Sequence, residues 1–228
     1  MKKKIKKLPK AIAIAIVSLI SFIPFYYTLI AATHSTDEVM LGLSLLPGSH
    51  LIENIATAMN GTFWVAFKNS MIVSFSAMFC SVAISLMAGY GLAAYQFKLK
   101  RVIYNFVLLT MMVPSLLVVI GYMQEMRALR LSGSLLPLIL IWFPSGFGVF
   151  WITQYLQNSL QMELVESARI DGCNEFSIFL KIVLPCIRPA IISLCLLIFL
   201  WSWNSYLLPL VMINNVENYT IPLYIQSL

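Results

Sequence analysis

The sequence predicts an all-α protein that crosses a membrane several times. Hydrophobic residues make up 60% of the 228-residue chain and charged residues only 11%, and the mean hydropathy is +0.87. A soluble domain carries about a quarter charged residues, so this composition indicates an integral membrane protein. A helix needs about 20 apolar residues to cross the hydrocarbon. Within one domain over 1–228, five stretches are predicted to span it in a polytopic transmembrane helix bundle: about 11–32, 69–95, 102–122, 134–155 and 189–213.

The first span, 11–32, follows a lysine-rich start and could be mistaken for a secretory signal peptide that is cleaved after Ala32. Its apolar run is longer than a signal core of 7–15 residues, and Pro24 within it is tolerated where neighbouring helices satisfy the backbone. We therefore expect a retained span, followed by an outside loop over 33–68. In this loop Ser49 can cap a short helix, which would either contact a solute-binding protein or have no partner.

The next three spans contain small residues and prolines. The second, 69–95, ends in a run that includes Gly89 and Gly91, and small residues let helices approach closely in lipid. Pro114 predicts a kink in the third span. Several residues indicate that the fourth span is broken, either beside a cavity or as a packed bend: Pro137, Pro144, Gly146 and Gly148.

The fifth span carries four side chains that could line a substrate pathway: Trp201, Trp203, Asn204 and Tyr206. Aromatic rings stack on sugar faces, and an amide exchanges hydrogen bonds with hydroxyl groups. An asparagine at membrane depth usually faces protein or a cavity. The alternative is a helix–helix hydrogen bond for Asn204 and interfacial anchoring for the tryptophans.

Basic residues are distributed unevenly between the loops, and this predicts the orientation. One side would hold Lys2, Lys3, Lys4, Lys6, Lys7, Lys10, Lys98, Lys100, Arg101, Arg169, Lys181 and Arg188, and the other only Lys68, Arg127 and Arg130. Because cytoplasmic loops carry the excess of lysine and arginine, the N-terminus and the segment 158–188 are predicted to be cytoplasmic. The net charge of +6 is then a topology signal with possible contact to anionic lipid, and it requires no nucleic-acid partner.

The segment 158–188 is a polar island between two apolar runs, and its residues predict two short helices joined by a glycine turn. Gly172 suits the end of the first helix, because glycine takes the left-handed conformation without steric cost. Asn174 can cap the second helix, and Glu175 favours its positive end. Pro185 is expected to end or kink that helix. An apolar stripe lies between them: Phe176, Phe179, Leu180 and Val183.

This island resembles the EAA loop of ABC importer permeases, which reads E-A-A, three residues, G, nine residues, I-x-L-P. Glu166-Ser167-Ala168, Gly172 and Ile182-x-Leu184-Pro185 fit that spacing, with Ser167 in place of the usual alanine. An ordinary helical loop would explain the amphipathicity but not the whole register. Further fragments follow the order seen in carbohydrate importer permeases of the maltose-type G subunit: Asn69-Ser70, Ala93-Ala94-Tyr95, Met112-Val113-Pro114, Trp203-Asn204 and Tyr219-Thr220-Ile221-Pro222.

The resemblance implies a multi-pass permease subunit in the cell membrane that translocates a sugar or oligosaccharide. It would pair with a homologous permease subunit and two cytoplasmic ATPase subunits, and receive solute from an extracellular solute-binding protein. The family has a sixth span that is absent here, so the chain is expected to be truncated or to lack that helix. The implied ATPase-coupling residues are Glu163, Glu166, Ser167, Ala168, Asp171, Gly172, Ile182, Leu184 and Pro185.

Other classes of protein fit the sequence less well. The chain has no G-x-x-x-x-G-K-[ST] motif, so it is not expected to bind or hydrolyse ATP itself. An intramembrane enzyme would need paired ionisable groups within spans, whereas all nine acidic residues fall in loops or at their edges. No cofactor or metal is expected, because His34 and His50 lack ligand partners and the cysteines form no C-x-x-C. The alternatives are a permease for a non-sugar solute such as glycerol phosphate or a peptide, a channel, or a membrane scaffold.

Overall fold

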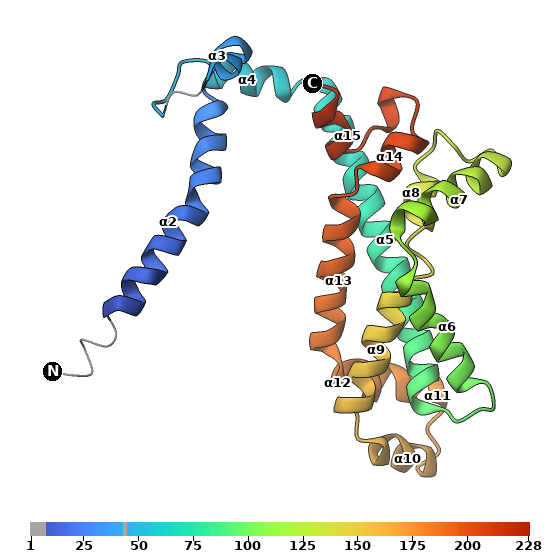
Figure 1. Cartoon of the computed structure of the whole chain (residues 1–228). Helices are drawn as coiled ribbons and strands as arrows, with labels where there is room; N and C mark the ends of the chain where they lie inside the picture. Colours follow the sequence, from blue (N-terminus) through green and yellow to red (C-terminus); the bar gives the residue numbers. More distant parts are fainter. Residues whose placement is uncertain (1–7, 43–44) are drawn as a thin grey trace. The chain divides into compact units, whose positions relative to one another are not determined.

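The computed structural model describes residues 8–42 and 45–228, and these residues form helices joined by turns and loops (Figure 1). The predicted all-α class is confirmed, since the described residues contain no strand. Contacts divide the chain into two compact units, 1–61 and 62–228. The predicted orientation of the N-terminus rests largely on lysines outside the described residues: Lys2, Lys3, Lys4, Lys6 and Lys7.

The first unit contains one long helix, α2 (Leu8–Ala31), with Pro24 inside it. The described side chains from 9 to 29 are all exposed, although most of them are apolar. Such a helix must be covered by lipid or by protein, because so continuous an apolar surface is unfavourable in water. Its length and composition are sufficient to cross a membrane.

Two short helices complete the first unit. α3 (Thr36–Leu41) begins with a capping box in which Ser35 and Glu38 each bond the backbone of the other, which satisfies two free N–H groups of the helix. α4 (Leu51–Ala58) has no side-chain cap. The predicted capping role of Ser49 is therefore wrong.

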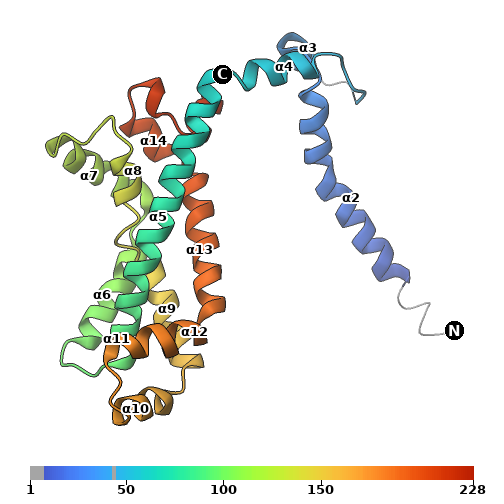
Figure 2. The ribbon, with the colours of Figure 1, turned by 180° about the vertical axis from the view of Figure 1, so that it is seen from behind.

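The second unit is built around α5 (Gly61–Ala94), α9 (Gly146–Ser159) and α13 (Arg188–Trp203). α9 packs against α13 and against α6 (Lys100–Met112). Figures 1 and 2 show α5 running beside these helices from both directions of view. α5 starts at Gly61, within the predicted outside loop. The core between the helices is almost fully buried and apolar: Val82, Leu86, Ile152, Leu156, Leu194 and Ile198.

Small residues bring α5 and α9 into close contact, as predicted for Gly89 of the second span but not for Gly91, beside which the space is open. A Cβ atom on Gly89 would lie 2.7 Å from Cγ2 of Ile152, and one on Gly148 would collide with Oγ of Ser85. No larger side chain fits at either position without moving the helices apart. In lipid, where burial of apolar surface drives little association, such close packing holds helices together.

The predicted third span is sharply bent. α6 ends at Met112 and α7 (Ser115–Ala128) begins after Pro114, at an angle of 99°. Proline lacks an N–H group and forces the preceding residue into an extended conformation, and Val113 is extended with φ −74° and ψ 124°. The predicted kink at Pro114 is confirmed, but the segment 102–122 is not one straight helix.

The predicted fourth and fifth spans are each broken. The segment 134–155 contains α8 (Leu136–Leu140) and most of α9, separated by residues 141–145. The segment 189–213 contains α13 and α14 (Leu207–Met212), separated by residues 204–206. Pro144 lies in the first break, so the predicted break of the fourth span is confirmed; Pro209 follows the second break, which was not predicted.

The C-terminal segment is fastened to α5. After a short 3-10 turn (Val216–Asn218) and α15 (Ile221–Gln226), the chain lies against the start of α5. The Asn69 amide nitrogen donates to the backbone carbonyls of Glu217 at 2.7 Å and Tyr219 at 3.0 Å. Two of the motif fragments found separately in the sequence thus meet in the fold.

Within the described residues, α2 and α5 are the helices long and apolar enough to cross a membrane alone. The number rises to four if each of two bent pairs counts as one span. These pairs are α6 with α7, and the helical segment 175–186 with α13, which meet at 80°. The predicted span at 134–155 is not among them, because its break leaves two short helices.

Candidate functional site

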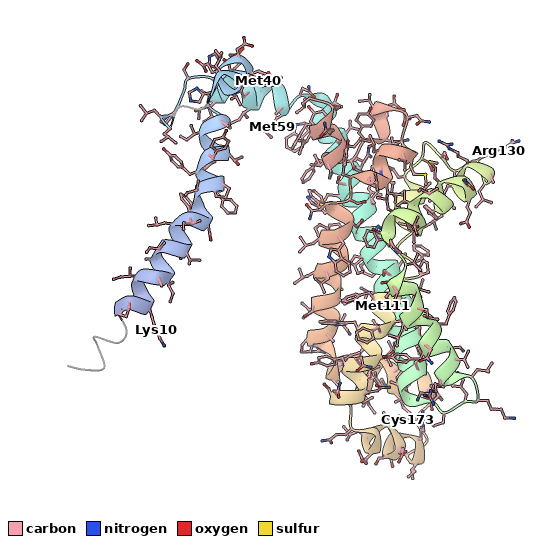
Figure 3. The ribbon with its side chains drawn as sticks, in the orientation of Figure 1. Lys10, Met40, Met59, Met111, Arg130 and Cys173 are labelled. Carbon is pink, nitrogen blue, oxygen red and sulfur yellow. The ribbon has the colours of Figure 1, made fainter. Side chains whose placement is uncertain are left out.

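The polar island forms a helical hairpin at one end of the second unit. It consists of α10 (Met162–Ile170), α11 (Glu175–Ile178), a π-helical turn (Phe179–Val183) and α12 (Leu184–Cys186). Figure 3 shows Cys173, which follows the hairpin's first helix, at the opposite end of the unit from Arg130 of the α7–α8 loop. The predicted helix–glycine–helix arrangement is confirmed.

A glycine turn ends α10, for the reason the sequence suggested. Gly172 has φ +80°, a left-handed conformation that favours glycine. The N–H of Cys173 donates to the carbonyl of Ala168 at 3.0 Å, and the N–H of Gly172 donates to that of Arg169 at 3.1 Å. These two bonds form a Schellman motif, which satisfies carbonyls left free at the helix end.

The second helix of the hairpin begins with the predicted cap. The side chain of Asn174 accepts a hydrogen bond from the N–H of Ser177 at 2.8 Å. Glu175 lies in the first turn, where a carboxylate stabilises the positive end of the helix. The turn and the cap together fix the path of the chain between α10 and α11.

One face of α10 is buried in the core of the unit and the other is exposed. Val165 and Ala168 are buried beside Ile178, Val183 and Ile187 of the following segment. The exposed face combines carboxylates with apolar side chains that a partner protein could cover: Glu163, Glu166 and Asp171, with Leu164 at 48% and Ile170 at 85% exposure.

The nine predicted coupling residues therefore fall into two groups. The exposed group consists of Glu163, Glu166, Ser167, Asp171 and Gly172. The remaining four, Ala168, Ile182, Leu184 and Pro185, are buried or partly buried. Ile182 and Leu184 pack against the same apolar core as α10. The second half of the motif thus supports the hairpin from inside and does not present a surface to a partner.

The helix end or kink predicted at Pro185 lies two residues further along the chain. The helix continues to Cys186, and the 80° bend lies at Ile187. The π-helical turn explains this, because the N–H of Leu184 bonds the carbonyl of Phe179, five residues back, and Pro185 then falls at a helix start where its missing N–H costs little. Pro189, at the start of α13, follows the bend.

One carboxylate joins three elements at the base of the hairpin. Glu175 accepts hydrogen bonds from Arg169 (Nε to Oε1 2.6 Å, Nη2 to Oε2 3.2 Å), from the Tyr95 hydroxyl (2.5 Å) and from the Tyr90 hydroxyl (3.2 Å). The Arg169 guanidinium also lies 5.4 Å from the centre of the Tyr95 ring. We call these four residues the Glu175 cluster. It connects α10 and α11 to the end of α5.

The Glu175 cluster holds its carboxylate ionised. Hydrogen bonds from Arg169 and then from Tyr95 lower the pKa of Glu175 to about 2. A glutamate with a lowered pKa stabilises the folded state fully above its ordinary pKa of about 4.5, and this contribution is lost as the pH falls toward 2. The cluster is therefore intact at any physiological pH.

The Glu175 cluster was not predicted. In the sequence, Arg169 is only a topology signal, and Glu175 only a favourable charge at a helix start. The two residues are six positions apart, so they do not match the i, i+3 or i, i+4 spacing of ion pairs within one helix. The tyrosines come from a distant part of the sequence, and no local pattern links them to Glu175.

The four candidate pathway residues face different neighbours. Trp201 packs edge-on against Phe147, with ring centres 5.0 Å apart, and Trp203 stacks on Phe199 at 5.7 Å. Asn204 is exposed at the end of α13, and its amide donates to the carbonyl of Leu200 at 2.8 Å. Among the described residues, the Asn204 amide thus bonds within its own helix and forms no bond to another helix. Tyr206 packs in a separate cluster with α7, α8 and α14.

Comparisons with known proteins place this arrangement among transport proteins. Residues 81–227 match the family model described as "Binding-protein-dependent transport system inner membrane component". The arabinooligosaccharides transport system permease protein AraQ of Halalkalibacterium halodurans is 32% identical, with 95% of this chain and 79% of that protein covered. The lactose transport system permease protein LacG of Rhizobium radiobacter is 28% identical (98% and 82% covered). The sn-glycerol-3-phosphate transport system permease protein UgpE of Escherichia coli is 30% identical (85% and 72% covered).

A solved structure has the same fold. It is a crystal structure of a bacterial ABC transporter involved in the import of the acidic polysaccharide alginate. One chain of that structure matches with a TM-score of 0.84. The match covers 100% of this chain and 81% of the chain in that structure. The sequences are 21% identical, so the likeness concerns the fold.

Proposed function

The chain belongs to the family of binding-protein-dependent transport system inner membrane components, and on this premise we propose that it carries a sugar or oligosaccharide as the permease subunit of an ABC importer. The family and the apolar helices indicate a multi-pass protein of the inner membrane. The observation that carries the proposal is the exposed face of α10, which is held on a buried base within the matched region. Relatives named for arabino-oligosaccharides and lactose favour a carbohydrate.

The partners in this proposal are a homologous permease subunit, two cytoplasmic ATPase subunits and an extracellular solute-binding protein. α10 is the coupling helix that enters a cleft of an ATPase subunit. Glu163, Glu166 and Asp171 face basic groups of that subunit, while Leu164 and Ile170 lose their exposed apolar surface on contact. The N-terminus and the hairpin lie in the cytoplasm, where the ATPase subunits are.

The ATPase drives transport through the base of the hairpin. When nucleotide closes the ATPase subunits, α10 moves with them, and packed elements carry the movement further. One route passes through Val165 and Ala168 into the core shared with α13. The other passes through the Glu175 cluster into α5. The chain itself supplies no ATPase chemistry.

A transport assay tests this function. The chain is co-expressed with a homologous permease subunit and the ATPase subunits, reconstituted in liposomes with a solute-binding protein, and supplied with labelled lactose, arabino-oligosaccharide or glycerol 3-phosphate. We expect ATP-dependent uptake of a carbohydrate. Selective uptake of glycerol 3-phosphate would support the second candidate function, which the similarity to UgpE favours. Solute flux without the ATPase subunits would contradict an importer and indicate a channel.

We also propose that Trp201, Trp203, Asn204 and Tyr206 lie along the solute pathway. The support is the exposed amide of Asn204 at the break after α13, together with the nearby aromatic rings. An exposed amide at such a break can exchange hydrogen bonds with sugar hydroxyls.

Replacing Asn204 with alanine should raise the KM for uptake several-fold and leave assembly unchanged. Removal of one sugar-binding hydrogen bond costs about 0.5–1.5 kcal/mol. Asn158→Ala is the matched control, because the Asn158 amide also donates to the carbonyl four residues earlier, that of Gln154 at 2.8 Å. Equal uptake kinetics in both variants and the wild type would remove Asn204 from the pathway.

A further inference from the structure

A cationic pocket of about 340 Å³ lies at the turn between α5 and α6. Its polar lining comes from Gln96, Lys98, Lys100, Arg101, Tyr104 and Gln157. Three of these side chains are cations, and no carboxylate lines the pocket. Like charges this close together repel one another unless an anion neutralises them, so the pocket is suited to an anionic ligand.

The polar groups of the pocket are available to such a ligand. Lys98 and Arg101 are exposed and form no ion pair with another described residue. The ammonium group of Lys100 is held by the backbone carbonyl of Tyr95 at 3.0 Å, which orients its charge without neutralising it. The hydroxyl of Tyr104 accepts from the Gln154 amide at 2.7 Å, which leaves its own proton free to donate. Several donors and cations in one place match the oxygens of a phosphate.

An apolar groove of about 410 Å³ continues from the pocket. The two share Leu92 and Phe97 in their linings. The groove runs along α5 and α6, with Ile103 and Val107 on one side and Gly91 on the other. A Cβ atom on Gly91 would meet nothing within 4 Å. The space along the groove is therefore open.

We propose that the pocket and the groove together bind one anionic glycerophospholipid, with its phosphate in the pocket and an acyl chain in the groove. A cationic site joined to an apolar channel matches both parts of such a lipid, whereas inorganic phosphate or a nucleotide would use the pocket alone. Basic residues mark the cytoplasmic side of membrane proteins, and the inner leaflet on that side supplies anionic lipids. Tyr95 lines the groove and belongs to the Glu175 cluster, so the lipid would lie beside the base of the hairpin.

Lipid binding to the purified full-length chain tests this proposal. Native mass spectrometry would compare phosphatidylglycerol with phosphatidylcholine, and vesicles of each lipid would provide apparent affinities. We expect the wild type to retain phosphatidylglycerol preferentially. Two lysine or arginine contacts contribute about 1 kcal/mol each at an anionic surface, so Lys98→Gln with Arg101→Gln should weaken phosphatidylglycerol binding about tenfold or more. Lys68→Gln with Arg127→Gln, which removes two exposed cations elsewhere, should have no such effect.

A second variant separates a lipid from a soluble anion. Gly91→Leu places a side chain in the open groove, and leucine is favourable in a helix, so the fold should be unaffected. We expect Gly91→Leu to weaken phosphatidylglycerol binding. Any binding of added inorganic phosphate to the pocket should be unchanged in this variant. Phosphatidylglycerol binding that both variants leave intact would overturn the proposal. If inorganic phosphate displaces phosphatidylglycerol and Gly91→Leu does not weaken phosphatidylglycerol binding, the lipid proposal is overturned and the pocket binds a soluble anion. Since Lys98 and Arg101 are exposed, their substitution tests the pocket even if Gly91→Leu fails to fold.

Discussion

Glu166→Arg is expected to abolish co-purification of the chain with the ATPase subunits. Glu166 is exposed on α10, and the proposed partner surface is basic, so reversal of the charge replaces attraction by repulsion. Like charges brought together at an interface cost several kcal/mol, and retained ATPase should fall at least about tenfold. The measurement is the ratio of subunits after affinity purification of the complex in mild detergent.

Two further variants complete this experiment. Glu125→Arg reverses an exposed glutamate on α7 and should leave the ratio of subunits unchanged. Deletion of 163–172 removes α10 and should abolish association completely. If Glu166→Arg and the deletion both assemble normally, α10 is not the contact with the ATPase, and the proposed function loses its structural support.

Glu175→Gln is expected to uncouple ATP hydrolysis from transport. Glutamine keeps the shape of the side chain but loses the charge that Arg169 and the two tyrosines bind. Hydrogen bonds to a charged group are about twice as strong as neutral ones. Coupling free energies of 1–3 kcal/mol correspond to factors of about 5–150, so the solute moved per ATP should fall at least about fivefold. Uptake and ATPase rates are measured on the same reconstituted complexes.

The ratio of uptake to ATP hydrolysis distinguishes uncoupling from loss of protein. Partial unfolding would lower both rates together and leave the ratio unchanged. Glu125→Gln is the matched control. Arg169→Gln should behave as Glu175→Gln does, and the double variant should be little worse than either, because residues that act as one unit are not additive. An unchanged ratio in these variants, in complexes that assemble normally, would mean that the Glu175 cluster only stabilises the hairpin.

Local chemistry explains why the hairpin was predictable. Gly172 and Asn174 are chosen by backbone conformation and capping, which depend on only a few neighbouring residues. The same holds for the kink at Pro114. The class of the protein followed from composition, because a chain with so few charges cannot form an ordinary soluble surface.

The break in the fifth span and the contacts between distant segments were not predictable in this way. The break in 134–155 was indicated by its prolines and glycines, but apolar length suggested a continuous span at 189–213, which is divided as well, because hydropathy is averaged over the residues that interrupt the helix. Pro185 was misplaced as the bend, since nothing in the sequence indicates a π-helical turn. The Glu175 cluster depends on how α5 packs beside α10.

The same limit applies to the candidate pathway. Trp201 and Trp203 are two positions apart on α13, so the helix directs their side chains to different faces, and each packs against its own aromatic neighbour. A cluster of suitable residues in the sequence does not establish that they meet. On α10, by contrast, the contacts do separate two faces: Val165 and Ala168 are buried, whereas Glu163 and Glu166 are exposed.

The contact between α10 and an ATPase subunit can be tested directly by crosslinking. Cys173 and Cys186 are exposed on the same hairpin, so both are first replaced by serine. A photoreactive maleimide is then attached at Ser167→Cys in the assembled transporter, with Arg127→Cys on α7 as the control position. Crosslinking of position 167, but not of position 127, to the ATPase subunit is the predicted result. An intact complex in which position 167 forms no adduct with the ATPase would contradict the account.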